Sequence, residues 1–415
     1  MYTSVRGGPE VPVAEAPTKR ASAPRRAVGS TVILLGLTSL FTDISAEMVS
    51  AVLPLFLTLQ LGLTPLQFGF IDGLYQGVTA LVRLLGGYAS DRWRRPKAVA
   101  STGYALSAVC KLALLPVGSL AGIGAVVAAD RSGKGLRTAP RDALIAASAR
   151  PEAYGRAFGV HRALDTFGAM LGPLVASALL AANALAYDVV FVTSFCFALV
   201  GLAIILLFVP EHRVAVTSGR EVTVRTSLGL LRDRAFARLV VAATALGLLT
   251  VSDGFIYLTL LRRDDVVTVV FPLLFFGTSA VYLLLAVPMG WLADRIGRRV
   301  VFLGGHAALL GCYAAVTGPA TGLLAVGACL ALLGAYYAAT DGVLAAAAAP
   351  LLPEHLRSTG LATLQTLVAM ARFGSSVAFG ALWTVWGVGW AYLLVAAGLI
   401  VALPVAALLL KDRGQ

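Results

Sequence analysis

Long apolar segments, separated by short polar stretches, fill the chain from residue 31 to residue 410. A helix of about 20 mostly apolar residues is long enough to cross a lipid bilayer. The pattern predicts twelve such helices, at about 31–58, 66–90, 97–118, 121–148, 156–182, 187–210, 237–261, 266–293, 299–318, 321–350, 357–385 and 388–410. We therefore expect an all-α integral membrane protein, since closed helices satisfy their backbone hydrogen bonds within lipid.

The composition agrees with this pattern. Of the 415 residues, 58% are hydrophobic and only 13% are charged, about half the usual share in soluble domains. Residues 1–30 are rich in Pro, Ala and Arg and are expected to form a disordered, basic cytoplasmic tail, with a second short tail at 411–415. The four cysteines lie in apolar runs without a CxxC pair, so we interpret them as packed side chains and predict no metal site.

The net charge of +12 is unevenly placed. Basic residues gather in the N-terminal tail, after the second predicted helix and in the polar stretch 211–235. This asymmetry follows the positive-inside rule and predicts a multi-pass protein of the inner (cytoplasmic) membrane with both termini in the cytoplasm. The excess charge then faces anionic lipid, and no nucleic-acid partner is expected.

The two halves of the sequence resemble each other. Three positions after the second predicted helix recur after the eighth, 203 residues later: Gly87, Asp91 and Arg92 match Gly290, Asp294 and Arg295. A further pair repeats at a similar offset: Asp43 in the first predicted helix matches Asp253 in the seventh, 210 residues later. The repeat predicts a six-helix bundle at 31–210, a cytoplasmic connector at 211–235 and a second six-helix bundle at 236–410.

These motifs resemble those of the major facilitator superfamily. The pattern G-x-x-x-D-R-x-x-R is similar to that family's loop signature between helices two and three, and R-S-G-K-G, from Arg131, to its fourth-helix motif. The stretch G-A-M-L-G-P resembles the fifth-helix motif of bacterial proton-coupled efflux permeases; it contains Gly168, Gly172 and Pro173. The resemblance implies two pseudo-symmetric six-helix bundles, and a cavity lined by helices one, four, seven and ten. It also implies a cytoplasmic gate formed by Gly87, Asp91, Arg92, Arg156, Gly290, Asp294, Arg295 and Arg298.

Ionisable residues inside the predicted helices are costly in lipid and therefore indicate function. Asp43 and Glu47 share one face of the first helix, and the estimated depth of Arg131 on the fourth helix is similar to that of Asp43. Burial raises a carboxylate pKa and a nearby arginine lowers it, so alternation between the two environments would move a proton. The candidate residues for proton coupling and the central cavity are Asp43, Glu47, Arg131, Lys134, Arg137, His161, Arg162, Asp165, Asp253 and Asp341. We rank Asp43 and Glu47 first, with Arg131 as the competing cation, and Asp165 with His161 second.

Static salt bridges are the alternative interpretation of these charges, and we favour it for Asp130, Asp142 and Arg141. The sequence contains no phosphate-binding loop, nucleophile elbow or metal-spaced histidine cluster, so no cofactor is expected and the chain is not predicted to be an enzyme. The leading interpretation is a monomeric secondary transporter in the lipid bilayer that exports a drug-like molecule or metabolite by proton antiport. The alternatives are a proton-symport importer and, with less support, an intramembrane enzyme or a non-transporting receptor. The charge of the substrate stays open.

Overall fold

The computed structural model describes residues 29–93, 95–150, 153–183, 185–211, 229–263, 267–353 and 356–411, and every regular element in these ranges is helical. The first half comprises α1 (Ser30–Leu55) with a π-helical extension η1 (Phe56–Gln60), α2 (Pro65–Trp93), α3 (Pro96–Ala113), α4 (Leu120–Ala147), α5 (Tyr154–Ala182) and α6 (Tyr187–Phe208). The second comprises α8 (Arg234–Gly247), α9 (Asp253–Arg263), α10 (Phe271–Ile296), α11 (Arg298–Thr317), α12 (Gly322–Ala348), α13 (Arg357–Trp386) and α14 (Val388–Leu409). Two short 3₁₀ turns, η3 (Thr268–Val270) and η4 (Ala349–Leu351), precede α10 and follow α12.

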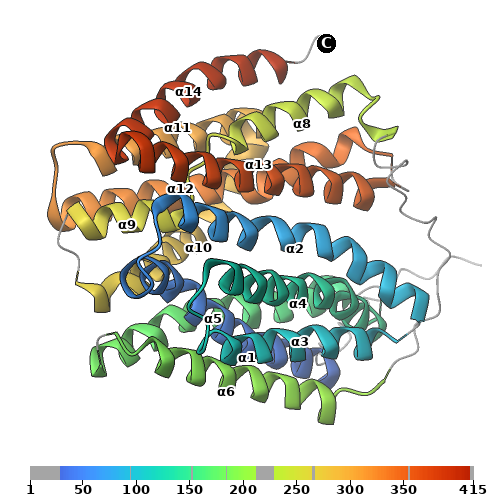
Figure 1. Cartoon of the computed structure of the whole chain (residues 1–415). Helices are drawn as coiled ribbons and strands as arrows, with labels where there is room; N and C mark the ends of the chain where they lie inside the picture. The colour runs from blue at the N-terminus through green and yellow to red at the C-terminus, as the bar shows by residue number, and fades with distance from the viewer. Residues whose placement is uncertain are drawn as a thin grey trace, which may run out of the picture.

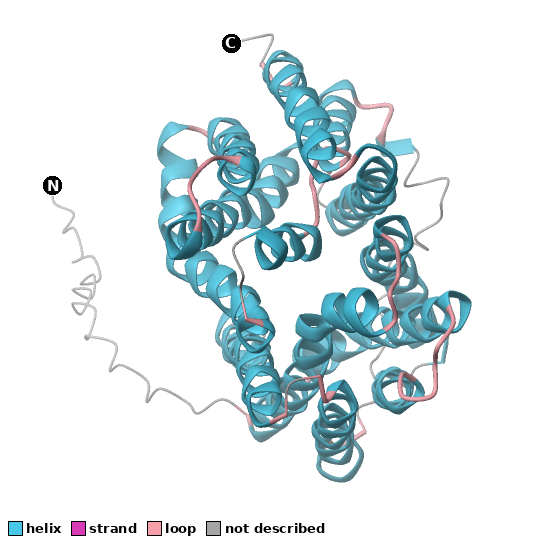
Figure 2. Ribbon diagram, turned by 60° about the vertical axis from the view of Figure 1, so that its left-hand side comes forward, coloured by secondary structure: helices cyan, strands magenta, loops and turns pink. Residues whose placement is uncertain are grey.

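The helices form two bundles, with α1–α6 below and α8–α14 above in Figure 1. Figure 2 shows the same two groups more nearly along their helix axes. Because α8 and α9 together make one crossing, the described part of the chain crosses the molecule twelve times. This architecture confirms the predicted all-α membrane fold. The start of α1 and the end of α14 lie at the same end of the molecule, which we call the near end. We call the opposite end the far end.

Eight helical segments in the described ranges are long and apolar enough to span a membrane by length and composition alone. The other crossings are α2, α3, α4 and the α8–α9 pair. Helix α4 buries charged side chains, among them Asp130, Arg131 and Arg137, which lowers its mean hydropathy. The polar crossings are therefore held by protein contacts on several sides rather than by lipid alone.

Small residues bring the helices of the first bundle close together. A Cβ atom on Gly172 of α5 would lie 2.8 Å from the carbonyl oxygen of Ile44 on α1. Gly168, one turn earlier, faces the backbone of Leu40 in the same way. The two glycines of the predicted fifth-helix motif thus allow α5 to lie directly against the backbone of α1, as small residues do in membrane helix pairs.

The seventh crossing is broken, whereas the sequence predicted one continuous helix at 237–261. Helix α8 ends at Gly247 and α9 begins at Asp253. Between them, the hydroxyl of Tyr313 accepts a hydrogen bond from the Val251 amide at 2.8 Å and donates one to the Leu249 carbonyl at 2.9 Å. One side chain of α11 therefore satisfies backbone groups that a continuous helix would have paired internally.

The bundles meet along one tight seam between α2 and α13, which lie side by side in Figure 1. Glycines of α2 permit this approach: a Cβ on Gly77 would meet Met370, and a Cβ on Gly73 would meet Phe373. Nearer the near end, Arg83 donates a hydrogen bond to Gln365 at 3.3 Å. The α2–α13 seam therefore holds the bundles together over much of the length of both helices.

Candidate functional site

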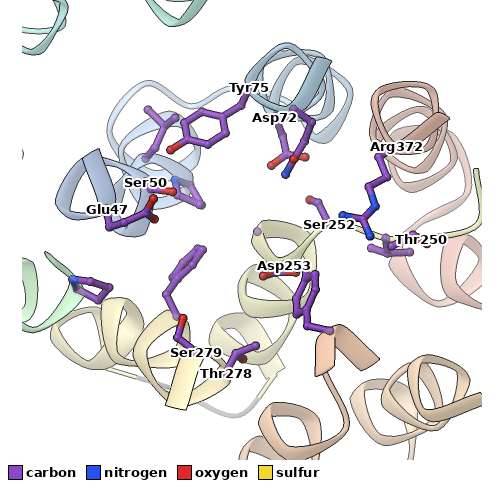
Figure 3. A pocket seen from close by; sticks show the side chains of 18 of the residues that line it. Glu47, Ser50, Asp72, Tyr75, Thr250, Ser252, Asp253, Thr278, Ser279 and Arg372 are labelled. Atoms are coloured by element: carbon purple, nitrogen blue, oxygen red, sulfur yellow. Dashed lines mark hydrogen bonds between the residues drawn. The ribbon is translucent and has the colours of Figure 1, made fainter. Parts of the chain in front are cut away.

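A cavity of about 470 Å³ lies between the two bundles. This volume suits a small organic molecule. The lining residues come from α1, η1, α2, α5, the break before α9, α9 itself, α10, α12 and α13, and none comes from α4. Helix four was expected to line the cavity, so that part of the prediction is wrong: α4 packs against α2 and α3. Figure 3 shows the polar side chains that point into the space.

Aromatic packing closes the far end of the cavity. The ring of Phe255 on α9 lies 4.8 Å from that of Phe68 on α2 and 4.9 Å from that of Phe379 on α13. Trp383 adds a further ring 5.6 Å from Phe255. At the same end, Ser177 of α5 donates a hydrogen bond to the Val269 carbonyl at 2.7 Å, which joins α5 to the turn before α10. Both bundles contribute to this closure.

Several residues of α5 and α10 are exposed toward the near end. A Cβ atom added at Gly155 or Gly159 of α5, or at Gly290 of α10, would have no neighbour within 4 Å. The side chain of Arg162 on α5 is exposed, and Trp291 on α10 is 69% exposed. The two bundles are therefore in contact beside the far end of the cavity, whereas these near-end positions of α5 and α10 are open to the surroundings.

Hydroxyl groups of the second bundle hold two carboxylates at the cavity. The Tyr337 hydroxyl donates to Asp253 at 2.6 Å. The Ser376 hydroxyl of α13 donates to Asp72 of α2 at 2.6 Å, and this bond crosses between the bundles. Arg372 extends toward the same space, where its Nη2 donates to the Tyr336 hydroxyl at 3.0 Å (Figure 3). The structure thus places Asp253 at the cavity, as predicted, and Asp341 also lines it.

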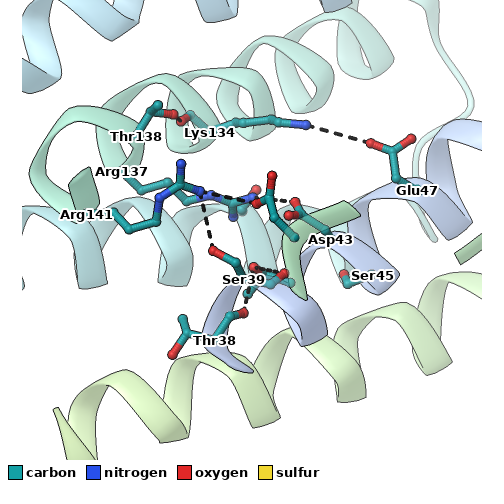
Figure 4. A network of polar contacts seen from close by, with 12 residues as sticks. Thr38, Ser39, Asp43, Ser45, Glu47, Lys134, Arg137, Thr138 and Arg141 are labelled. Atoms are coloured by element: carbon teal, nitrogen blue, oxygen red, sulfur yellow. Dashed lines mark hydrogen bonds and ion pairs between the residues drawn. The ribbon is translucent and has the colours of Figure 1, made fainter. Parts of the chain in front are cut away.

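The first bundle contributes a row of ion pairs between α1 and α4 (Figure 4). Lys134 Nζ lies 3.7 Å from Glu47 Oε1, and both side chains are partly exposed. Arg137 Nη2 lies 3.7 Å from Asp43 Oδ1, and both are buried. Of these four residues, Glu47 is the one that lines the cavity.

This row continues to α5. Asp165 forms two ion pairs: Arg141 Nη1 lies 3.5 Å from its Oδ1, and Arg162 Nη1 lies 3.2 Å from its Oδ2. Asp43 and Asp165 thus each face an arginine of α4, Arg137 and Arg141, which lie about one turn apart. The first-ranked and second-ranked carboxylates of the sequence analysis therefore lie along one row of α4 cations.

His161 of α5 joins the same network through Ser39 of α1. The Ser39 hydroxyl lies 2.9 Å from His161 Nε2 and accepts a bond from Arg141 at 3.3 Å. The histidine is buried, and its neighbours come from three helices. We define the proton network as Ser39, Asp43, Arg137, Arg141, His161 and Asp165.

Arg131 does not pair with Asp43 or Glu47, contrary to the sequence prediction. Its guanidinium forms an ion pair with the adjacent Asp130, with Nε at 2.9 Å, and lies 3.7 Å over the Tyr75 ring. Asp130 also accepts bonds from Lys111 at 2.8 Å and from Ser107 at 2.6 Å. This compact, buried cluster between α3 and α4 fits the static salt bridge that we favoured for Asp130.

The predicted gate motif is only partly described. Gly87, Asp91 and Arg92 lie in helix α2, but their side chains fall outside the described part of the structure. In the second copy, Arg298 lies 3.7 Å from Asp294 and donates to the Ala346 carbonyl at 2.6 Å. The side chains of Asp294, Arg295 and Arg156 are exposed at the near end. Their role as a gate stays a prediction.

Asp72 and Arg372 line the cavity but were not among the predicted site residues. Each is an ionisable residue within an apolar helix, and this alone was a signal of function. Their place at the cavity depends on the rotation of α2 and α13 about their axes. The third motif residue of helix five, Pro173, also faces the cavity, whereas Gly168 and Gly172 contact α1.

Comparison with known proteins identifies relatives over most of the chain. The family model described as Major Facilitator Superfamily matches residues 35–272. An uncharacterised MFS-type transporter of Methanocaldococcus jannaschii is 29% identical over 388 residues, which cover 90% of this chain and 93% of the relative. The solved structure of the nucleoside transporter NupG superposes with a TM-score of 0.79 at 12% identity, covering 92% of this chain and 100% of NupG. A bacterial homologue of the human lysosomal transporter Spinster, solved in an inward-facing and occupied conformation, gives 0.72 at 14% identity, covering 91% and 96%.

Proposed function

The chain belongs to the major facilitator superfamily, and we propose that it is a secondary active transporter that exports a small molecule across the cytoplasmic membrane in exchange for protons. In this proposal the cavity between the bundles is the substrate site. The proton network on α1, α4 and α5 is the coupling site. A single chain encloses the cavity, so a monomer suffices.

The cavity is the observation that carries this proposal. It is formed by both bundles and lies beside aromatic packing at the far end, whereas near-end positions of α5 and α10 are open to the surroundings. Rocking of one bundle against the other would exchange these two arrangements, which is alternating access. The basic connector and N-terminal tail belong on the cytoplasmic side by the positive-inside rule, so the near end would be cytoplasmic. The conformation described here is then inward-open.

The proton network supports coupling to protons. Asp43 and Asp165 can each carry a proton, and the guanidinium groups of Arg137 and Arg141 stabilise their ionised forms. These side chains come from three helices, so a small displacement of α4 relative to α1 and α5 changes which carboxylate has a cationic partner. Glu47, paired with Lys134, lies between this network and the cavity and gives the substrate a route to influence it.

Everted membrane vesicles test this function. Respiration acidifies their interior, and an acid-sensing dye reports the release of internal protons when an exported compound is added from a chemical panel. We expect at least one compound to restore the dye signal in vesicles that contain the protein. The Asp43→Asn variant should lose this response, whereas Asp188→Asn, an exposed residue in the first turn of α6, should retain it.

Two results would contradict the proposal. If Asp43→Asn and Asp165→Asn, each well folded, both keep the full proton response, the coupling site lies elsewhere. If compounds accumulate in right-side-out vesicles when the external medium is acidified, and none releases protons from everted vesicles, the transporter is a proton-symport importer instead.

A further inference from the structure

The charges that line the cavity are unbalanced. Four carboxylates border it, on Glu47, Asp72, Asp253 and Asp341, against the single guanidinium of Arg372. Among the described residues only Glu47 of these four has a lysine or arginine at ion-pair distance. The cavity therefore has a net negative charge when its carboxylates are ionised.

Hydroxyl groups replace cations as the partners of the two best-defined carboxylates. Asp253 accepts from Tyr337 and Asp72 accepts from Ser376, each at 2.6 Å. In Figure 3 both carboxylates point into the same space from different bundles. A neutral donor positions a carboxylate without neutralising it, and an unneutralised charge at this depth is costly to maintain. Two carboxylates aimed at one cavity can therefore be neutralised by protons or by a cation that enters the cavity, and a cation can contact both at once.

Arg372 cannot supply that cation fully. Its Nη2 is bound to the Tyr336 hydroxyl, and its buried Nε atom has no hydrogen-bond partner in the described part of the structure. The guanidinium thus has donor capacity left over while the nearby carboxylates lack ion pairs. It can contact an oxygen atom of a bound molecule at one edge of the cavity.

Aromatic rings complete the lining. Tyr75, Phe275, Tyr282 and Tyr337 border the same space as the carboxylates. The faces of such rings attract organic cations, and their apolar bodies stabilise an aromatic or aliphatic ligand. With a volume of about 470 Å³, the cavity can enclose a molecule of a few fused rings.

We propose that this cavity binds an organic cation, a protonated amine or onium group attached to an aromatic or apolar body, with Asp253 and Asp72 as its counter-ions. This inference rests on the transport function proposed above and specifies its substrate class. Carboxylates from the two bundles would contact one ligand, so the bound cation would link the halves that move during transport.

Two planar three-ring dyes of opposite charge test the proposal on the purified, detergent-solubilised full chain. Proflavine is a cation at neutral pH and resorufin is an anion, and both are fluorescent. Each dye is titrated alone, and fluorescence polarisation is compared with that in protein-free micelles. We expect proflavine to bind at least tenfold more tightly than resorufin.

Three variants assign the effect to the cavity. Asp253→Asn and Asp72→Asn should each weaken proflavine binding about tenfold or more, and Asp188→Asn, away from the cavity, should leave it unchanged. Arg372→Gln removes the cavity's one positive charge and should tighten proflavine binding several-fold. A gain in affinity cannot result from misfolding, so this variant tests the proposal even if the aspartate variants prove unstable.

The inference is overturned if resorufin binds as tightly as proflavine, if neither dye binds, or if both aspartate variants retain wild-type affinity. Dye binding requires no proton gradient. A failure of the dye test beside a positive vesicle test therefore removes the cationic substrate and leaves proton-coupled transport in place. If the dye test is positive and the vesicle tests are negative, the cation site stands and proton-coupled transport is removed.

Discussion

Replacement of Gly172 by alanine should destabilise the protein through the contact of α5 with α1. The added Cβ would lie 2.8 Å from the Ile44 carbonyl oxygen and 2.9 Å from the Met48 amide nitrogen. Carbon–oxygen contacts are ordinarily about 3.3–3.6 Å long, so α5 would have to move away by roughly 0.5 Å or more. Both neighbours are backbone atoms within a helix and cannot rotate aside.

The expected magnitude follows from two opposing effects. Alanine is favoured over glycine in a helix by about 1 kcal/mol, whereas overpacking of a tight contact costs about 1–3 kcal/mol. Gly159→Ala on the same helix isolates the first effect, because its Cβ would have no neighbour within 4 Å. The difference in stability between the two variants should therefore be about 1–3 kcal/mol, with Gly172→Ala the less stable.

Thermal unfolding of the purified protein in detergent, followed by loss of the monodisperse gel-filtration peak, measures this difference. A gap of about 1–3 kcal/mol corresponds to roughly 2–10 °C in Tm for a bundle of this size. If Gly172→Ala unfolds at or above the temperature of Gly159→Ala, the close approach of α5 to α1 is not present in the folded protein.

The other predictions concern charges. Asp130→Asn should destabilise the protein by about 3–5 kcal/mol, because it leaves buried cations unpaired. Glu47→Gln should cost at most about 1 kcal/mol, because its ion pair is partly exposed. Thermal unfolding of the two variants measures this difference in stability. In a double-mutant cycle, Asp43→Asn and Arg137→Gln together should cost less than the sum of the single variants, and additive losses would exclude their interaction. An Arg295→Cys variant should react with a membrane-impermeant maleimide in everted vesicles and not in intact cells, and the opposite labelling would invert the proposed orientation.

The helices could be predicted from the sequence because the bilayer fixes their length. Eleven of the twelve predicted crossings match single described helices, most within three residues at either end. The exception is the seventh, where the short polar segment Thr-Val-Ser-Asp at 250–253 lies within a longer apolar stretch that the sequence analysis read as one helix. Its break depends on Tyr313, more than fifty residues further along the chain, and no local pattern reveals that partner.

The charge partners could not be predicted for a related reason. Depth along a helix follows from residue number, but the direction of a side chain depends on how the helix is rotated against its neighbours. The depth estimate placed Arg131 level with Asp43, but Arg137, nearly two turns further on, pairs with Asp43, while Arg131 lies over the Tyr75 ring of α2. Asp72 reaches its partner Ser376 only because α2 and α13 pack together, a pairing between halves that the internal repeat does not specify.

The glycine-lined seam between α2 and α13 has a consequence for molecules dissolved in the bilayer. On that flank Gly69 lies against the Ser376 carbonyl and Gly77 against Met370, so the wall between lipid and cavity is sealed. On the opposite flank, toward the near end, α10 carries exposed apolar groups such as Trp291. A compound dissolved in the bilayer therefore meets a closely packed helix pair on the first flank, and any lateral route to the cavity would have to pass elsewhere.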